Sequence, residues 1–327
     1  MKVAWVHSFG SDNSLSGIFM HELLPAVRNT GVQVDMFSTG DLYSAKRIIH
    51  NISELRQSTR KYDIVHAQWG SGCAFVTAFL ESKKFVTLRG SDWYGVTNGK
   101  NIKTRLRGHL ASYISRLSLA RFSRIIVVSN RMRRDIVSRR NTQSVVVIPD
   151  GIDLNRFRSI DKMKARTLLG FENDKRPWVL FASVQKGNVI KRPEMAQKAF
   201  DICRMKVPDA QFKIISGLDR ESVALFMNAG DVLLVTSTHE GWPNVVKEAM
   251  ACNTPFVSTD VSDLASISAK TKWCRIEIAS PEALGLALAQ VLQRKEEENL
   301  RQHITWMSHD RIADELVQEY KRVLRQN

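Results

Sequence analysis

The sequence contains only four cysteines, and no two of them lie close together in the chain. They are Cys73, Cys203, Cys252 and Cys274. Disulfide-stapled folds and common zinc sites need closely spaced cysteines or a histidine at ligand spacing, and neither pattern occurs here. Reduced, buried thiols are therefore expected, and they favour a cytoplasmic protein.

Long hydrophobic runs are absent as well. The start, MKVAWVHSFGSDNS, has no apolar core of signal-peptide length, and no later run approaches the ~20 residues that cross a bilayer. Low-complexity tracts and repeats are also missing, and 43% hydrophobic with 25% charged residues is ordinary for a globular chain. We expect a folded protein that is not integral to a membrane, and 327 residues favour two domains.

Acidic residues are few relative to basic ones, with 33 against 48, so the net charge is +15. Such a charge attracts nucleotides, acidic lipids or nucleic acids. Much of it lies in residues 103–140, where apolar side chains recur at helical spacing. These apolar residues are Leu106, Leu110, Ile114, Leu117 and Phe122. The pattern predicts an amphipathic basic helix that packs its apolar stripe on its own core, or else touches an anionic membrane surface.

Short β-branched runs alternate with helical patterns along the chain, which predicts an α/β fold with two parallel sheets. The first series is KVAWVH, VQVDMF, DIVHAQ, KFVTLRG, RIIVVS and VVVIPDG, and the second is WVLFAS, FKIISG, DVLLVTS, PFVSTD and WCRIEI. The predicted domains are residues 1–158 and 159–308, with a helix over 309–327 that returns to the first domain. Ligands of such sheets bind beyond the carboxyl ends of the strands.

The segment HEGWPNVVKEAM places two carboxylates, Glu240 and Glu248, around a tight turn. The preceding run reads as a buried strand, and the run from Pro243 reads as a helix whose first N–H groups can bind an anion. One carboxylate can accept hydrogen bonds from sugar hydroxyls beside a phosphate, and the other can hold a ribose diol. The alternatives are a helix N-terminal charge for Glu240 and an exposed helix residue for Glu248.

The longer segment HEGWPNVVKEAMACNTPFVSTDV resembles the donor site of family-four retaining glycosyltransferases, which have the GT-B architecture. Similar support comes from RIIVVSNRMRRDI with VVVIPDGIDLNRF, from DIVHAQWG and from KFVTLRGSD. The resemblance implies two Rossmann-like βαβ domains that face each other across a cleft. It also implies transfer of a hexose-like sugar from a UDP- or GDP-sugar with retained configuration. The nucleotide-sugar is a co-substrate, and neither a metal nor another cofactor is implied.

The resemblance assigns most donor contacts to that segment. Glu240 contacts the donor sugar, Glu248 contacts the ribose, and the turn and helix start supply further contacts through Gly241, Trp242, Pro243, Asn244 and Val245. Lys191 matches the family's phosphate-binding lysine. The usual partner arginine is missing, and Lys186 either replaces it or is a solvated loop lysine. Ser16 and Gly17, at an expected helix start, offer a second phosphate contact, although the family often has two glycines there.

The acceptor side carries weaker signals. Arg89 and Asp92 are acceptor-side candidates. Arg89 stands where many relatives place a histidine, but arginine cannot act as a general base. His66 is a further acceptor-side candidate, but a histidine inside a buried strand end is more often structural. Without a well-placed base, the resemblance favours front-face substitution, in which the departing phosphate takes the acceptor proton. The predicted catalytic residues are Glu240, Lys191 and Arg89.

Several alternatives stay open. No nucleic-acid motif occurs, so nucleic acid is not an expected partner. A glycan or lipid-linked acceptor is expected, in polysaccharide or glycolipid biosynthesis, with the protein peripheral on the inner face of a membrane. A GT-B phosphorylase or sugar-nucleotide epimerase is the alternative enzyme. A catalytically silent sugar-nucleotide-binding protein is a further alternative, because Asn253 and Ser262 stand where relatives usually have glycine.

Overall fold

The chain forms two compact units in a computed structural model that describes residues 1–9, 17–40, 42, 44–95, 102–138, 144–183 and 189–326. One unit comprises Met1–Gly151 with His309–Asn327, and the other comprises Ile152–Ser308. The sequence placed the first boundary after residue 158. Residues 152–158 instead belong to the second unit, because the N–H of Ile152 donates to the Met307 carbonyl at 2.9 Å and Phe157 is fully buried.

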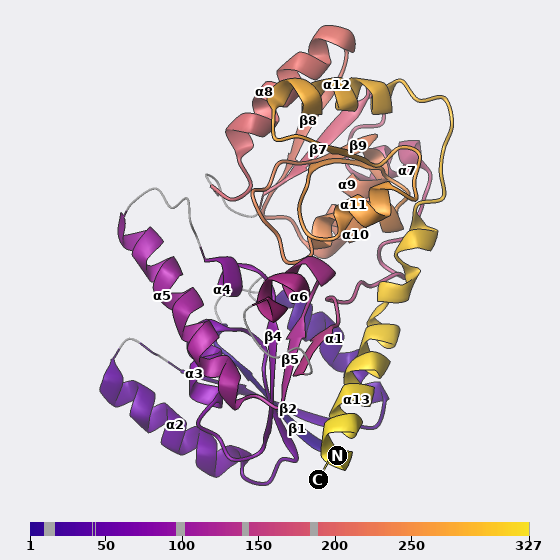
Figure 1. Cartoon of the computed structure of the whole chain (residues 1–327). Helices are drawn as coiled ribbons and strands as arrows, with labels where there is room; N and C mark the ends of the chain where they lie inside the picture. Colours follow the sequence, from indigo (N-terminus) through magenta and orange to yellow (C-terminus); the bar gives the residue numbers. More distant parts are fainter. Residues whose placement is uncertain are drawn as a thin grey trace. The chain divides into compact units, whose positions relative to one another are not determined.

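The first unit is built on a parallel sheet of six described strands (Figure 1). In spatial order they are β2 (Gln33–Ser38), β1 (Lys2–His7), β3 (Ile64–Ala67), β4 (Lys83–Leu88), β5 (Arg124–Val127) and β6 (Val145–Val147). Trp5 of β1 is in register with Met36 of β2 and His66 of β3. The central strands are buried on both faces, as parallel strands covered by helices must be.

Helices cover both faces of this sheet, with α2, α3 and α5 on one side and α1 and α13 on the other (Figure 1). They are α1 (Ile18–Asn29), α2 (Ala45–Thr59), α3 (Ser71–Thr77), α4 (Ser91–Tyr94), α5 (Ile102–Ser118), α6 (Asn130–Val137) and α13 (His309–Arg325), with a 3-10 turn at Leu119–Arg121. The last helix packs against α1 and buries Ile312, Leu316, Tyr320 and Val323. This apolar face explains why the end of the chain joins the first unit.

The second unit has a parallel sheet of five described strands, which confirms the predicted pair of βα series. Their order is β11 (Arg275–Glu277), β10 (Phe256–Thr259), β9 (Val232–Val235), β7 (Trp178–Ala182) and β8 (Gln211–Ile215). The helices are α7 (Lys162–Leu168), α8 (Pro193–Lys206), α9 (Arg220–Ala229), α10 (Asn244–Ala251), α11 (Leu264–Ser268) and α12 (Pro281–Leu292), with 3-10 turns at Arg301–His303 and Thr305–Met307.

The core of the second unit depends on close approach of α8 and α12, which lie together on one side of its sheet (Figure 1). A Cβ atom on Gly285 of α12 would lie 2.6 Å from the Ala199 carbonyl of α8, so glycine permits the contact. Phe181, Phe200 and Leu284 belong to the core cluster between them. Among the described residues, no helix combines the length and the apolar character that a membrane span requires.

Candidate functional site

The segment that resembles a donor site, residues 239–261 (called the donor segment below), begins in the loop between β9 and α10 at the carboxyl edge of the second sheet. Glu240 lies in the connecting loop, and its Oε1 accepts hydrogen bonds from Lys191 Nζ at 2.6 Å and Ser237 Oγ at 2.7 Å. The Lys191 and Glu240 side chains are 23% and 17% exposed. The structure therefore brings together a cation and a carboxylate that are 49 residues apart, and leaves both partly open to solvent.

The loop before α8 positions Lys191 through its neighbour Arg192. Arg192 has a left-handed backbone conformation, with φ of 49°, and its guanidinium donates to the carbonyls of Thr236 and Ser237. In the opposite direction, the Thr236 hydroxyl donates to the Lys191 carbonyl. These bonds tie the loop after β7 to the loop after β9. The role of Arg192 depends on its backbone conformation, which no sequence motif indicated.

Glu248 lies inside α10 and is only 5% exposed, so the alternative of an exposed helix residue is wrong. Its Oε1 accepts a hydrogen bond from Arg220 Nη1 at 2.7 Å. Arg220 is the first residue of α9, and its guanidinium carbon lies 4.8 Å from the ring centre of Phe157. Arg220 was not among the residues predicted from the sequence. The sequence indicated this residue only by its place, because Arg220 is a basic residue soon after the end of an expected strand, and ligand-binding loops of parallel sheets occur there.

The turn between the two glutamates is held by buried groups. The hydroxyl of Ser262 donates to the Gly241 carbonyl at 2.5 Å, from a residue whose own φ is 56°. Trp242 is 6% exposed, and the ammonium of the buried Lys247 lies 5.3 Å from its ring centre. Pro243 is the N-cap residue of α10, and its side chain makes no capping hydrogen bond to the first N–H groups of the helix. The start of α10 can therefore donate to an anion beside Glu240.

Arg89, in the first unit, is held on several sides. Its Nε donates to Asp150 Oδ1 at 2.8 Å, its Nη1 donates to the Gln68 carbonyl, and its guanidinium lies 3.8 Å from the ring centre of Phe19. The side chains of Arg89 and Asp150 are 6% and 9% exposed. A planar guanidinium suits this combination of forked hydrogen bonds and ring stacking. Its position fixes the loop after β4.

Asp92 organises the same loop. Its carboxylate accepts hydrogen bonds from the backbone N–H groups of Gly70, Arg89 and Gly90 at 2.9 to 3.2 Å. Gly90 has φ of 126°, which side chains rarely tolerate. Burial raises the pKa of Asp92 above its ordinary value, while the N–H donors and Arg89 act in the opposite direction. The carboxylate thus holds two strand-end loops of the first unit together.

His66 is enclosed by the protein. Its Nδ1 lies 2.6 Å from the Tyr320 hydroxyl and its Nε2 lies 2.8 Å from the Thr87 hydroxyl. The Trp5 ring nitrogen also donates to Tyr320, at 3.1 Å. The residue is 1% exposed, and burial lowers the pKa of His66 well below its ordinary value. This geometry fits the structural alternative, in which the histidine ties α13 to the sheet.

The segment that was expected to supply a second phosphate contact is described only in part. Gly17 precedes α1 with φ of 73°, and a Cβ atom there would lie 2.7 Å from Cδ2 of Phe9. Both observations explain a glycine at this helix start. The predictions for Ser16 and Lys186 concern residues outside the described ranges.

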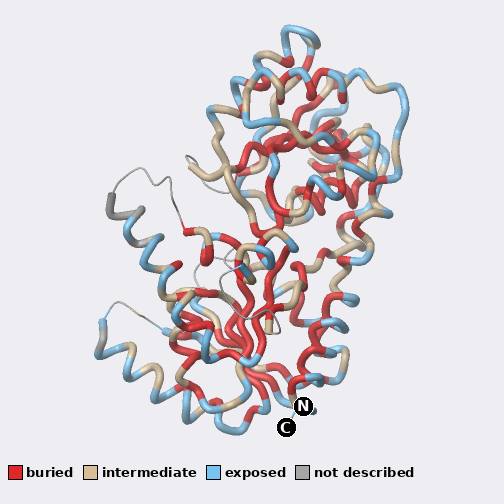
Figure 2. Tube along the Cα trace, in the orientation of Figure 1, coloured by how far each residue is buried: buried red, intermediate tan, exposed pale blue. Residues whose placement is uncertain are grey.

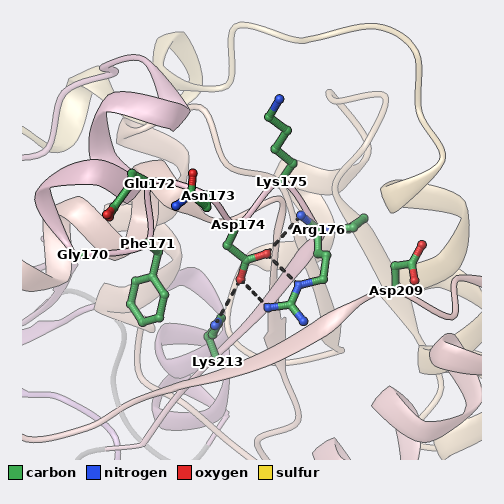
Figure 3. A pocket seen from close by; sticks show the side chains of 10 residues that line it. Gly170, Phe171, Glu172, Asn173, Asp174, Lys175, Arg176, Asp209 and Lys213 are labelled. Carbon is green, nitrogen blue, oxygen red and sulfur yellow. Dashed lines mark hydrogen bonds and ion pairs between the residues drawn. The ribbon is translucent and has the colours of Figure 1, made fainter.

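A hollow of about 710 Å³ lies before β7, away from the donor segment (Figure 3). Asp174 lies between Arg176 and Lys213, accepting hydrogen bonds from Arg176 Nε at 2.8 Å and Trp178 Nε1 at 3.1 Å. The Lys213 ammonium lies 4.3 Å from the Trp178 ring centre. The ion pair of Asp174 with Lys213 joins the loop to β8, and the hydrogen bond from Trp178 joins it to β7. The residues that line the hollow do not include the two glutamates of the donor segment. We assign it a structural role.

Comparisons with protein families match both units. The model for Glycosyltransferase Family 4 matches residues 17–156, and that for Glycosyl transferases group 1 matches residues 187–294. The chain is 25% identical over 285 residues to the putative teichuronic acid biosynthesis glycosyltransferase TuaC of Bacillus subtilis, covering 82% of this chain and 68% of that protein. It is 26% identical over 214 residues to the D-inositol 3-phosphate glycosyltransferase of Geodermatophilus obscurus, covering 54% and 46%. The chain thus spans about two thirds and about half of their lengths.

Solved structures share the architecture. Sucrose-phosphate synthase from Thermosynechococcus elongatus is similar over 100% of both chains, with a TM-score of 0.76 and 17% identity. HepE of Anabaena, solved in complex with UDP and glucose, is similar over 98% of this chain and 100% of its own, with a TM-score of 0.73 and 15% identity. These likenesses, with the two parallel sheets, show the GT-B fold.

Proposed function

Since the chain belongs to the family-four glycosyltransferases, we propose that it transfers a sugar from a UDP- or GDP-sugar to a glycan or lipid-linked acceptor with retained configuration. The observation that carries this proposal is the pairing of Lys191 with Glu240 beside the start of α10, with Glu248 further along the same helix. A nucleotide-sugar offers the matching chemistry, namely sugar hydroxyls, a diphosphate and a ribose diol.

Glu240 and Lys191 suit the junction between the sugar and the diphosphate. A carboxylate accepts hydrogen bonds from hydroxyls, and an ammonium binds phosphate oxygens. Because these groups are 2.6 Å apart, a donor that places its first sugar carbon near them can meet both. In the absence of donor, each neutralises the other, so donor binding exchanges an internal ion pair for two contacts to the ligand.

Glu248 suits the ribose. Arg220 occupies its Oε1 at 2.7 Å, and a carboxylate has two oxygens with about four lone-pair positions. It can therefore accept hydrogen bonds from a ribose diol while Arg220 fixes its orientation. UDP and UDP-glucose complexes of HepE, which shares this fold, support a uridine donor as the first one to test.

The reaction breaks the bond between the sugar and the diphosphate and forms the acceptor bond on the same face of the sugar. Negative charge grows on the departing phosphate, and Lys191 with the N–H groups of α10 stabilises that charge. The departing phosphate takes the acceptor proton. This choice is supported by Arg89, which cannot act as a base, and by His66, whose ring nitrogens both contact protein hydroxyls.

The acceptor belongs to polysaccharide or glycolipid biosynthesis, reached from the cytoplasmic side of a membrane. The relative whose name refers to teichuronic acid biosynthesis supports a growing glycan or its lipid-linked precursor.

The test is a donor and acceptor screen with product detection by mass spectrometry and NMR of the new anomeric centre. UDP- and GDP-sugars are incubated with soluble and lipid-linked glycans, with and without excess chelator. We expect one donor to give a product of unchanged anomeric configuration, at full rate in chelator. An inverted product would contradict retention, and reactivation by magnesium or manganese after complete loss in chelator would contradict metal independence.

A catalytically silent sugar-nucleotide-binding protein is the second candidate, and Arg89 is the observation that favours it. Arginine stands there in place of the histidine of many relatives, and it is fully engaged with Asp150, Gln68 and Phe19. Calorimetric binding of a nucleotide-sugar without transfer to any acceptor, and without slow hydrolysis, would support this candidate over the enzyme.

A further inference from the structure

Helix α5 packs on the first unit through its small polar residues. Ser112 donates to the Trp93 carbonyl, and Ser115 donates to the Asp92 carbonyl at 2.8 Å. Ser115 also accepts a hydrogen bond from the N–H of Ser71 at 2.6 Å, and Ser118 is buried too. The side of the helix that faces the protein is therefore made of hydroxyl groups, the reverse of an ordinary amphipathic surface helix.

Four large apolar residues of α5 point away from the protein, whereas Ile114 is half-buried. Leu106, Leu110, Tyr113 and Leu117 are 62%, 58%, 58% and 57% exposed. Their spacing places them within an arc of roughly 60° on a helix of 3.6 residues per turn, so they form one stripe. In Figure 2 the central strands of this unit are largely red, whereas much of α5 is pale blue. The favoured expectation, that Leu106, Leu110 and Leu117 pack on the core, is wrong.

Positive charge surrounds this stripe. The stretch from Trp93 through Arg134 holds no aspartate or glutamate and ten lysines and arginines, with Arg134 included. At 3.6 residues per turn, the positions of Lys103 and Arg107 lie on one side of the stripe, and that of Arg105 lies on the other. Arg116 is committed to the protein, because its guanidinium carbon lies 4.9 Å from the ring centre of the buried Trp93. Arg124 of the same stretch is committed elsewhere, in an ion pair with Glu319 at 3.1 Å.

We propose that α5 docks in the interface of an anionic lipid bilayer, with the stripe of Leu106, Leu110, Tyr113 and Leu117 between the acyl chains and the flanking cations at the phosphate groups. The helix is 17 residues long, or about 25 Å, so it can lie in the membrane plane. A second copy of the chain fits worse, because pairing two such stripes would bring two sets of cations together. Acidic lipid supplies both the apolar phase and the negative charge.

The docking surface is independent of the reaction, so it can be tested without donor or acceptor. The full chain is sedimented with vesicles of phosphatidylcholine alone or with 30% phosphatidylglycerol, at roughly 0.05 M and 0.5 M salt. We expect binding to the anionic vesicles at low salt and weaker binding at high salt, where screening is stronger. Changing Lys103, Arg105 and Arg107 to Gln should weaken it roughly 100-fold, at about fivefold for each cation.

The stripe is tested by changing Leu106, Leu110 and Leu117 to Ser, which should weaken vesicle binding at least about tenfold. The matched control changes Met205, Ile214 and Ile278 to Ser, because these residues of the second unit are 72%, 60% and 74% exposed. The matched charge control changes Lys198, Lys206 and Lys270 to Gln. Both controls should bind vesicles like the unchanged chain, and all variants should keep its melting profile.

Three outcomes would overturn the proposal. The first is absence of binding to anionic vesicles at low salt, and the second is an equal loss in the control variants. The third is a concentration-dependent dimer that the leucine variant abolishes, which would assign the stripe to a second copy. Because none of these measurements uses a nucleotide-sugar, failure of the proposed function would leave the docking result unchanged.

Discussion

The buried polar groups of the first unit differ from the charged pairs of the second in how much solvent they meet. Arg89 and Asp150 are 6% and 9% exposed, and His66 is enclosed between two hydroxyls. Lys191 and Glu240 are 23% and 17% exposed, and Arg220 is 21% exposed beside the buried Glu248. The first set is satisfied within the protein, whereas the second set can exchange protein contacts for ligand contacts.

This difference in exposure distinguishes polar groups that stabilise the fold from polar groups that can bind a ligand. Removing one partner from a buried, satisfied cluster leaves another polar group without its hydrogen bond, so the cost falls on stability. Removing a partly exposed partner leaves its neighbour within reach of water, so stability changes less and ligand contacts are lost. Variants of the buried set should therefore mainly lose stability, and variants of the partly exposed set should mainly lose activity.

The largest effect is expected from Lys191→Ala. The ammonium stabilises charge that grows on the departing phosphate, so kcat should fall on the order of 100- to 1000-fold. Steady-state kinetics with a saturating donor measures this, and the control is Lys198→Ala, an exposed lysine of the helix α8 that follows Lys191. A rise in KM with unchanged kcat would assign Lys191 to ground-state binding only.

Glu248→Ala should weaken donor binding roughly 10- to 100-fold, which corresponds to about 1.5–3 kcal/mol for a charge-assisted hydrogen bond. Calorimetry with the donor found in the screen measures the affinity. Glu248→Gln should retain part of it, and Glu282→Ala on the exposed side of α12 is the control. Unchanged affinity in a normally folded Glu248→Ala variant would remove this residue from the donor site.

Tyr320→Phe should affect stability and spare activity. The substitution removes the hydroxyl that contacts His66 and Trp5, and leaves buried polar atoms unpaired at a cost of about 1–3 kcal/mol. Denaturant unfolding measures the loss, and Tyr62→Phe, which removes a part-buried hydrogen bond to Asp35, should lose less. If the Tyr320→Phe variant had unchanged stability but lower turnover per folded molecule, the hydrogen bonds among Tyr320, His66 and Trp5 would have a role in catalysis instead.

The smallest effect concerns the pH dependence of stability. Burial and the charge of Arg89 lower the pKa of His66 well below 6.5, so the folded state binds this proton less well than the unfolded state. The stabilising contribution is complete above pH 6.5 and falls on acidification, by up to about 1.4 kcal/mol for each pH unit. Unfolding at pH 7 and pH 5.5 should show a smaller acid loss in His66→Asn. Equal losses in both proteins would contradict this role.

Much of the fold was predictable from local patterns. Buried parallel strands are short β-branched runs, and the two predicted series correspond to the two sheets. The first domain boundary was less predictable, because residues 152–158 are assigned by contacts with Met307 and Arg301, far along the chain. The orientation of α5 was also missed. Helical spacing identifies a stripe, but not which side of the helix faces the protein.

The sequence by itself determined the residue types of the donor segment, because Glu240, the turn and Glu248 lie within a few residues of each other. Tertiary structure alone decided which cations meet those carboxylates. Lys191 reaches Glu240 through the left-handed backbone of Arg192, and Arg220 reaches Glu248 because α9 packs beside α10. Such pairings depend on strand order and loop conformation, which place residues distant in the chain within hydrogen-bonding distance.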